Sequence, residues 1–228
     1  MCGIVGILIK DPDLEAELGA LLVPMLEALA ERGPDSTGLA IYRQEGQPVE
    51  IVKDVGSAPD VCRRYDIASR TGYQGIGHTR MATESAVTAR HCHPFSPAPE
   101  LCVVHNGSFS NHATVRRRLE ADGVVFDTDN DSEVAARFIG FRLAAGDDLE
   151  EAMRWVQKEF DGFFTLLVTT ATQFAVVRDP FACKPATVAE TDRYVAVASE
   201  YRALAGLPGV DGAAVFEPAP GELYTWSR

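Results

Sequence analysis

The chain has 228 residues, of which 46% are hydrophobic and 24% charged, a composition typical of a soluble globular protein with one large core or two small ones. Its formal net charge of −12 disfavours binding to nucleic acid or an anionic membrane, and no apolar run is long enough to span a bilayer. The five cysteines are scattered and odd in number, which argues against a disulfide framework. Together with the lack of a secretory signal pattern, they indicate a cytoplasmic protein.

The N-terminal segment combines a predicted strand with a candidate nucleophile. Residues 3–9 are apolar and rich in β-branched side chains, which predicts a buried strand. The strand follows Cys2, whose small side chain favours removal of Met1. An N-terminal cysteine carries a thiol and an α-amine, with ordinary pKa values of about 8.5 and about 8, so the amine can take the thiol's proton. Cys2 is therefore a candidate nucleophile with its own base, although a small residue at the start of a strand explains it equally well.

The first half of the chain alternates predicted helix and strands. Residues 14–31 repeat apolar side chains at helical spacing, and Pro24 is expected to kink or split this helix. A turn-rich loop over 32–38 precedes two strands, at 39–43 and 48–53, and residues 57–73 are ambiguous. Strands are also predicted at 75–80 and 101–105, with a long loop over 84–100 between them.

The second half contains three predicted helices and then a run of strands. Asn111 can cap a helix that reaches Ala121, another helix covers 132–145, and Asp148 with Glu151 forms a capping box for the third. The later strands are predicted at 163–169, 174–178, 187–190, 194–199, 215–217 and 222–224. Strands at both ends, helices between them and no linker predict one domain over residues 1–228. Its class is α+β, with two stacked sheets and helices outside.

All five histidines fall between residues 78 and 112, so we first considered a metal site there. His91, Cys92, His93, Cys102 and His105 include good zinc ligand types, but three adjacent residues of an extended loop cannot all face one ion. Residues 127–131 begin like a calcium loop, yet Ser132 and Phe138 stand where that loop needs Gly and Glu. We therefore predict no metal ligands.

Three polar features instead match the parts of one substrate. Arg80 lies just past a predicted strand, a good place for bidentate binding of a carboxylate. Asn106 and Gly107 follow another strand and could donate hydrogen bonds to an oxyanion, although an Asn-Gly pair alone is typical of a hairpin turn. Asp131 begins a helix, where a rigidly held carboxylate can bind a cationic group. Carboxylate, ammonium and oxyanion sites around Cys2 fit an amino acid with a side-chain amide, and glutamine is the obvious candidate.

Ordered motifs along nearly the whole chain resemble the class II glutamine amidotransferases, which are N-terminal-nucleophile hydrolases. The motifs are Cys2–Gly6, Arg32–Gly38, Gly77–Thr83, His93–Phe95, His105–Gly107, Asn130–Glu133, Arg178–Phe181 and Ala198–Glu200. The resemblance implies a four-layer αββα fold and hydrolysis of L-glutamine to L-glutamate and ammonia, with Cys2 as the nucleophile.

The resemblance also implies roles for individual residues. These are an oxyanion hole for Asn106 and Gly107, glutamine binding for Arg80 and Asp131, a place near the nucleophile for Arg32, and lining of the pocket and its covering loop for Thr83 and His93. Two residues depart from the family pattern: Met81 replaces a frequent aromatic residue, and Ala182 replaces a usual Gly. The first departure concerns closure over the substrate and its coupling to a partner, not the chemistry.

The chain is similar to stand-alone glutaminase subunits of glutamate-synthase-like complexes, including the N-methylglutamate-synthase type. This implies separate ammonia-accepting synthase subunits that carry a flavin and iron–sulfur clusters, whereas this chain shows no cofactor motif of its own. Two alternatives stay open. One is an independent amidohydrolase for another γ-glutamyl amide, and the other is a non-catalytic glutamine-sensing subunit, which retention of Met1 would favour.

Overall fold

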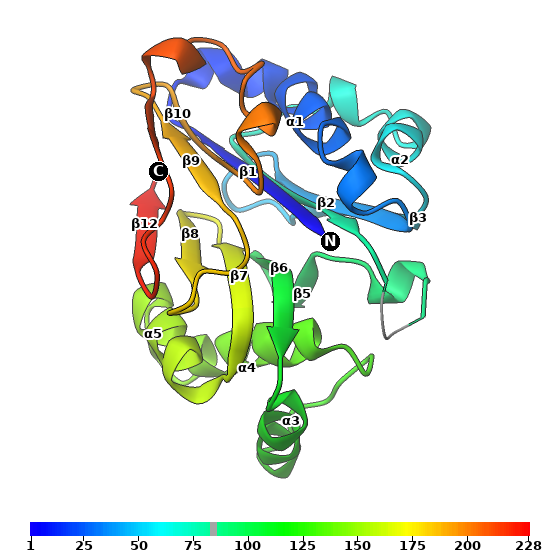
Figure 1. Ribbon diagram of the computed structural model, residues 1–228, viewed down its shortest axis with the longest axis vertical. Helices are drawn as coiled ribbons and strands as arrows, with labels where there is room; N and C mark the ends of the chain where they lie inside the picture. The colour runs from blue at the N-terminus through cyan, green and yellow to red at the C-terminus, as the bar shows by residue number, and fades with distance from the viewer. Residues whose placement is uncertain (83–85) are drawn as a thin grey trace.

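The computed structural model describes residues 1–82 and 86–228. Two β-sheets lie face to face, with helices on both outer faces, as Figure 1 shows. This arrangement confirms the α+β class and the four-layer αββα architecture. In the part of the chain that the structure describes, no helix has the length and apolar character needed to cross a membrane.

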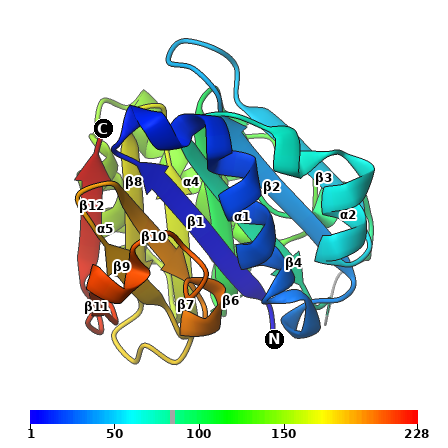
Figure 2. The same ribbon diagram turned by 90° about the horizontal axis from the view of Figure 1, so that it is seen from above.

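The first sheet contains seven of the described strands, and each neighbouring pair is antiparallel. The spatial order is β11 (Ala214–Phe216), β9 (Thr187–Glu190), β10 (Tyr194–Ala198), β1 (Gly3–Ile9), β4 (Gln74–Arg80), β2 (Ser36–Tyr42) and β3 (Glu50–Val55). Helices α1 (Leu18–Glu27) and α2 (Ala58–Arg64) cover its outer face (Figure 2). The central strand β1 is buried on both faces, which explains its nearly continuous apolar sequence.

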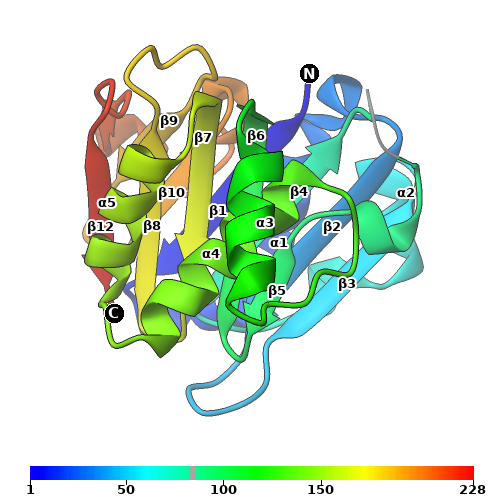
Figure 3. The ribbon, with the colours of Figure 1, turned by 90° about the horizontal axis from the view of Figure 1, so that it is seen from below.

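The second sheet contains five described strands, again all antiparallel. The order is β12 (Leu223–Ser227), β8 (Gln173–Arg178), β7 (Gly162–Thr169), β6 (Leu101–Phe109) and β5 (Phe95–Ala98). Its outer face is covered by α3 (His112–Ala121), α4 (Asp131–Ala144) and α5 (Leu149–Glu159), as Figure 3 shows. Short 3₁₀ helices lie at Pro12–Glu17, Ala30–Arg32, Ile67–Ser69, Ala89–His91, Tyr201–Ala203 and Val210–Gly212.

Alternation along β1 divides its side chains between two cores. Ile4 and Leu8 pack between the sheets, whereas Val5 and Ile7 belong to the core beneath α1. Between Ile4 and Leu8 stands Gly6, where a Cβ atom would lie 2.5 Å from the side chain of Leu167 on the other sheet. The two sheets can therefore approach closely at the centre of the molecule.

Two local predictions are wrong, and a third is decided in part. Pro24 is expected to kink or split its helix, and it does not split it, because it lies inside α1. It removes only the hydrogen bond to the carbonyl of the exposed Ala20, which water can satisfy. Asn111 precedes α3 without capping it, because its side chain bonds the main chain of Glu159 and Asp161 instead. The predicted loop over 84–100 includes a 3₁₀ helix and β5.

Candidate active site

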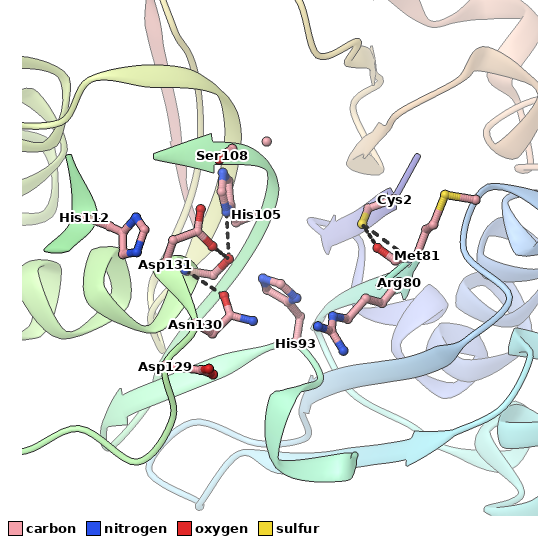
Figure 4. A pocket seen from close by; sticks show the side chains of 12 residues that line it. Cys2, Arg80, Met81, His93, His105, Ser108, His112, Asp129, Asn130 and Asp131 are labelled. Carbon is pink, nitrogen blue, oxygen red and sulfur yellow. Dashed lines mark hydrogen bonds between the residues drawn. The ribbon is translucent and has the colours of Figure 1, made fainter. Parts of the chain in front are cut away.

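A cavity of about 280 Å³ opens where the ends of the two sheets meet. It is lined by Cys2, Arg80, Met81, His93, His105, Gly107, Ser108, His112, Asp129, Asn130, Asp131 and Ser132. Figure 4 shows Cys2, Arg80 and Met81 on one side of it and Asp131, His105 and His112 on the other. We call the first group of three the thiol wall; it comes from the residue before β1, the last residue of β4 and the residue after β4. We call the facing side, from β6, α3 and the start of α4, the carboxylate wall.

Strand pairing places the thiol beside the arginine. Gly3 pairs with Thr79 in the antiparallel β1–β4 ladder, so the preceding Cys2 lies next to Arg80. Cys2 is half-buried, and its Sγ atom lies 3.5 Å from the main-chain nitrogen of Met81. Arg80 is only 5% exposed, and its Nη1 donates to the carbonyl of Ala86 at 3.0 Å.

Arg32 holds the main chain at the nucleophile. Its Nε donates to the carbonyl oxygen of Cys2 at 3.0 Å, and its guanidinium forms an ion pair with Glu200. Met1 is 59% exposed, and its amine donates to the sulfur of Met81 at 3.2 Å. Removal of Met1 would therefore take nothing from the core.

The Arg32–Gly38 loop supports this wall through main-chain contacts. A Cβ atom at Gly33 would lie 2.3 Å from the main chain of Thr79, so the loop packs directly on the end of β4. Asp35 accepts a hydrogen bond from the nitrogen of Ala82 at 2.7 Å. A Cβ atom at Gly38 would lie 1.9 Å from the carbonyl oxygen of His93, so the chain that carries His93 passes directly over β2.

The carboxylate wall centres on Asp131, the first residue of α4. Asn130 caps the helix, because its Oδ1 accepts from the nitrogen of Ser132 at 2.9 Å. The Asp131 carboxylate accepts from the nitrogen of Phe109 at 2.9 Å and from Ser132 Oγ at 3.2 Å. Each carboxylate oxygen keeps a second lone pair for a ligand, and the helix N-terminus stabilises the negative charge.

Asn106 and Gly107 lie within β6 and do not form the hairpin turn that an Asn-Gly pair often makes. Asn106 is 2% exposed and lies on the strand face of Cys102 and Val104, which pack between the sheets. Its Nδ2 donor has no hydrogen-bond partner among the described residues. Gly107 borders the cavity with φ of 154°, and a Cβ atom there would lie 2.0 Å from the carbonyl of Phe163.

Three buried histidines join the two walls. His78 Nε2 donates to the carbonyl of His105 at 3.0 Å, and the His78 ring stacks on His93 with centroids 4.0 Å apart. Burial lowers the pKa of His78 to about 3 and holds the pKa of His93 well below its usual range. Burial also lowers the pKa of His105, while the Asp131 carboxylate partly opposes that effect. As neutral rings, these histidines add no positive charge between Arg80 and Asp131.

The structure thus gathers Cys2, Arg80, His93, Gly107 and Asp131 around one cavity, with Arg32 and Asn106 directly behind it. Thr83 lies outside the described residues. Among the described residues, no three His, Cys, Asp or Glu side chains are placed to hold a metal ion. Such a thiol, with hydrogen-bond donors and one charge of each sign nearby, is suited to attack on an amide of a zwitterionic amino acid.

Sequence reasoning gave no roles to four residues that build the site. Asp35 holds the main chain after Arg80, and Glu200 pairs with Arg32. Ser132 donates to Asp131, and His105 bonds Ser132. Asp35, Ser132 and Glu200 belong to the ordered motifs, so the motifs themselves were the signal. Their contacts could not be read from the sequence, because most join segments far apart in the chain.

Comparisons with known proteins agree on one family. A family model described as "Glutamine amidotransferase domain" matches residues 78–206. The chain is 42% identical to the glutamine amidotransferase-like protein GlxB of Rhizobium meliloti, with 100% of this chain and 99% of that protein covered. It is 31% identical to a putative glutamine amidotransferase of Methanothermobacter thermautotrophicus, with 99% of each covered.

A solved structure extends the similarity to the fold. The glutamine phosphoribosylpyrophosphate amidotransferase of B. subtilis, complexed with ADP and GMP, matches with a TM-score of 0.82 at 25% identity. The match covers 100% of this chain and 49% of that one, so the chain spans about half the length of the solved enzyme.

Proposed function

The chain belongs to the class II glutamine amidotransferases, and we propose that it hydrolyses L-glutamine to L-glutamate and ammonia through a thioester on Cys2. We further propose that it delivers the ammonia to a separate synthase subunit. One observation carries the first proposal: a half-buried thiol shares a cavity with Arg80 on its own side and Asp131 on the opposite side. A zwitterionic amino acid can bind both charges while its side chain reaches the thiol.

In the proposed first step, the α-amine of Cys2, freed by removal of Met1, takes the thiol proton. The sulfur attacks the amide carbon of glutamine, and the carbonyl oxygen becomes an oxyanion. The buried Nδ2 of Asn106 and the N–H of Gly107 donate to that oxyanion, and the unpartnered state of Nδ2 supports this role. The amine then gives its proton to the departing nitrogen, which leaves as ammonia, and a γ-glutamyl thioester remains.

In the second step, the α-amine takes a proton from water, and the resulting hydroxide attacks the thioester carbon. The oxyanion forms again at the same donors, and its collapse breaks the carbon–sulfur bond. The thiolate recovers the proton from the amine, and glutamate leaves. Arg80 binds the α-carboxylate throughout, and Asp131 binds the α-ammonium, so the substrate stays oriented through both steps.

The separate partner is supported by the extent of the relatives. The alignments run over 297 and 306 positions and cover 99% of GlxB and of the Methanothermobacter protein, so those two proteins extend little past the ends of the match. We propose that the ammonia consumer is another polypeptide of the glutamate-synthase-like type, which carries the flavin and the iron–sulfur clusters.

Turnover by two cysteine variants tests the mechanism. We expect the protein to release ammonia and glutamate in equal amounts, and Cys2→Ala to reduce this rate by at least about 10³-fold because the nucleophile is lost. Cys183→Ala is the matched control, because Cys183 is an exposed free thiol outside the cavity lining. Hydrolysis that survives in Cys2→Ala would refute the thioester. Intact mass shows whether Met1 has left; if it is retained, the α-amine is not on Cys2.

Co-purification tests the partner. A C-terminally tagged chain drawn from its native cells should bring synthase subunits with flavin absorbance, and adding them should raise the glutaminase rate. A chain that purifies alone, with full activity on its own, would instead favour the independent amidohydrolase.

A further inference from the structure

A chain of side-chain hydrogen bonds runs behind the carboxylate wall. The Nδ1 atom of His105 lies 2.7 Å from Ser132 Oγ, and Ser132 Oγ lies 3.2 Å from Asp131 Oδ1. Figure 4 shows His105 and Asp131 on the same side of the cavity. His105 and Ser132 are 3% and 2% exposed, whereas Asp131 is half-buried at the cavity. We call this hydrogen-bonded series of His105, Ser132 and Asp131 the relay. It starts in the interior and ends at the carboxylate that we assign to the substrate ammonium.

The chemistry of the three groups gives the relay a direction. An ionised carboxylate only accepts hydrogen bonds, so the single hydroxyl hydrogen of Ser132 points to Asp131. The serine oxygen must then accept from His105, which places the imidazole hydrogen on Nδ1. The neutral ring that burial favours is the form that supplies this arrangement.

The histidine is held rigidly at the far end. Its ring stacks on Phe109 with centroids 4.4 Å apart, and its carbonyl accepts a hydrogen bond from His78. The main chain of Phe109 donates to the other oxygen of Asp131 at 2.9 Å. Both carboxylate oxygens are therefore tied to groups that β6 holds in place, and the rotation of the carboxylate is fixed by two contacts.

We propose that Ser132 and His105 are positioning residues that aim the Asp131 carboxylate at the α-ammonium of the substrate. They thereby make the chain select α-amino acid amides over amides that lack the amine. This inference rests on the proposed function and adds a selectivity device to it. Neither residue touches the reacting atoms.

A substrate without an α-amine distinguishes positioning of the Asp131 carboxylate from a general structural role of Ser132 and His105, because such a substrate does not use that carboxylate. Glutaramate is glutamine without its α-amine, so it keeps the amide and the carboxylate but offers nothing to Asp131. We expect Ser132→Ala to raise KM for L-glutamine by about tenfold, the effect of losing one hydrogen bond to a charged group. The same variant should leave kcat/KM for glutaramate within about twofold of the unmodified protein.

Two further variants guard against a folding defect. Ser132→Thr keeps a hydroxyl and should restore most of the affinity for glutamine. In an Asp131→Asn background, which removes the charge that the relay serves, Ser132→Ala should add little further loss. Equal losses for glutamine and glutaramate, or additive losses in the double variant, would overturn the proposal.

Binding measurements keep this test independent of turnover. Calorimetric titration with L-glutamate and with glutarate compares the same two ligand types when no hydrolysis occurs. Ser132→Ala should weaken L-glutamate binding about tenfold and leave glutarate binding unchanged. If the chain binds both but hydrolyses neither glutamine nor glutaramate, the proposed function fails while the relay stands. If hydrolysis occurs but the variant treats the two ligand types alike, the relay alone fails.

Discussion

The two walls of the cavity are built in different ways. On the thiol wall, the contacts of Cys2 Sγ with the described residues are long ones to the main chain of Met81, and Met81 is 39% exposed. On the carboxylate wall, Asp131 is held by a helix cap, a main-chain nitrogen and the serine–histidine relay. The contrast suggests a division of labour in which recognition is organised in advance and the nucleophile keeps freedom to move along its reaction path.

Because recognition is organised in advance, removing an oxyanion donor should affect turnover far more than binding. Asn106→Ala is expected to lower kcat by about 10²–10³-fold, because a donor to the oxyanion is lost, while KM changes little. Steady-state glutamine hydrolysis gives both constants. Ser110→Ala, an exposed position just beyond β6, is the control. A large rise in KM with unchanged kcat would contradict the assignment of Asn106.

Arg80 tests the comparison from the other side. It lies on the thiol wall, but we assign it to substrate binding, so its loss should affect KM more than kcat. Arg80→Lys should raise KM for glutamine by about 10–100-fold through loss of the bidentate contact, with a smaller change in kcat. Arg117→Lys, on the exposed face of α3, should leave both constants unchanged. An unaltered KM in Arg80→Lys would remove Arg80 from the substrate site.

The dependence of stability on pH tests the three buried histidines that join the two walls. His78, His93 and His105 have folded-state pKa values below the ordinary 6.5, so the unfolded chain binds more protons as the pH falls. Stability should therefore fall with pH from about 6.5 towards the pKa of about 3 for His78. For each imidazole that stays neutral at pH 5, the loss is about 2 kcal/mol.

Urea unfolding at pH 7 and pH 5 measures this loss. Carboxylates with lowered pKa values, such as Asp54, contribute mainly below about pH 4 and leave this window to the histidines. A His78→Asn variant should show a shallower dependence on pH. Equal slopes for the two proteins would show that His78 titrates normally.

The smallest expected effect concerns the chain segment that passes from β8 in one sheet to β9 in the other. Ala182 lies in this segment with φ of 50°, a left-handed conformation that favours glycine. The Gly that is usual at this position in the family adopts this conformation with less strain than Ala does. Ala182→Gly should stabilise the protein by about 0.5 kcal/mol, the strain relieved less the added entropy of the unfolded chain. Ala113→Gly, in α3, should destabilise it instead, and thermal unfolding compares the two.

Sequence patterns predicted well those elements that are defined by neighbouring residues in the chain. The Asp148–Glu151 capping box is present at the start of α5, and β1 follows its apolar sequence closely. Prediction failed where distant contacts decide the structure. Asn106 and Gly107 lie in a strand because β7 pairs with them, and Asn111 turns from its helix to the distant main chain of Glu159.

The same distinction holds for the candidate site. Chemistry-bearing residues such as Arg80 and Asp131 could be singled out by type and by their position at the ends of elements. Their supports could not, because Asp35 meets Ala82 and His105 meets Ser132 only after folding. The roles of these residues remain predictions that the variants above address.

The positions of the two chain ends have a practical consequence. The N-terminus lies just before β1, beside the cavity that Cys2 lines, whereas the C-terminus follows β12 at the outer edge of the second sheet (Figure 1). If Cys2 acts through its own α-amine, any affinity tag, reporter or fused enzyme placed before it would cap the reactive group and crowd the cavity. Extensions therefore belong after Arg228, and a gene fusion that joins this domain to an ammonia consumer has to place the consumer second.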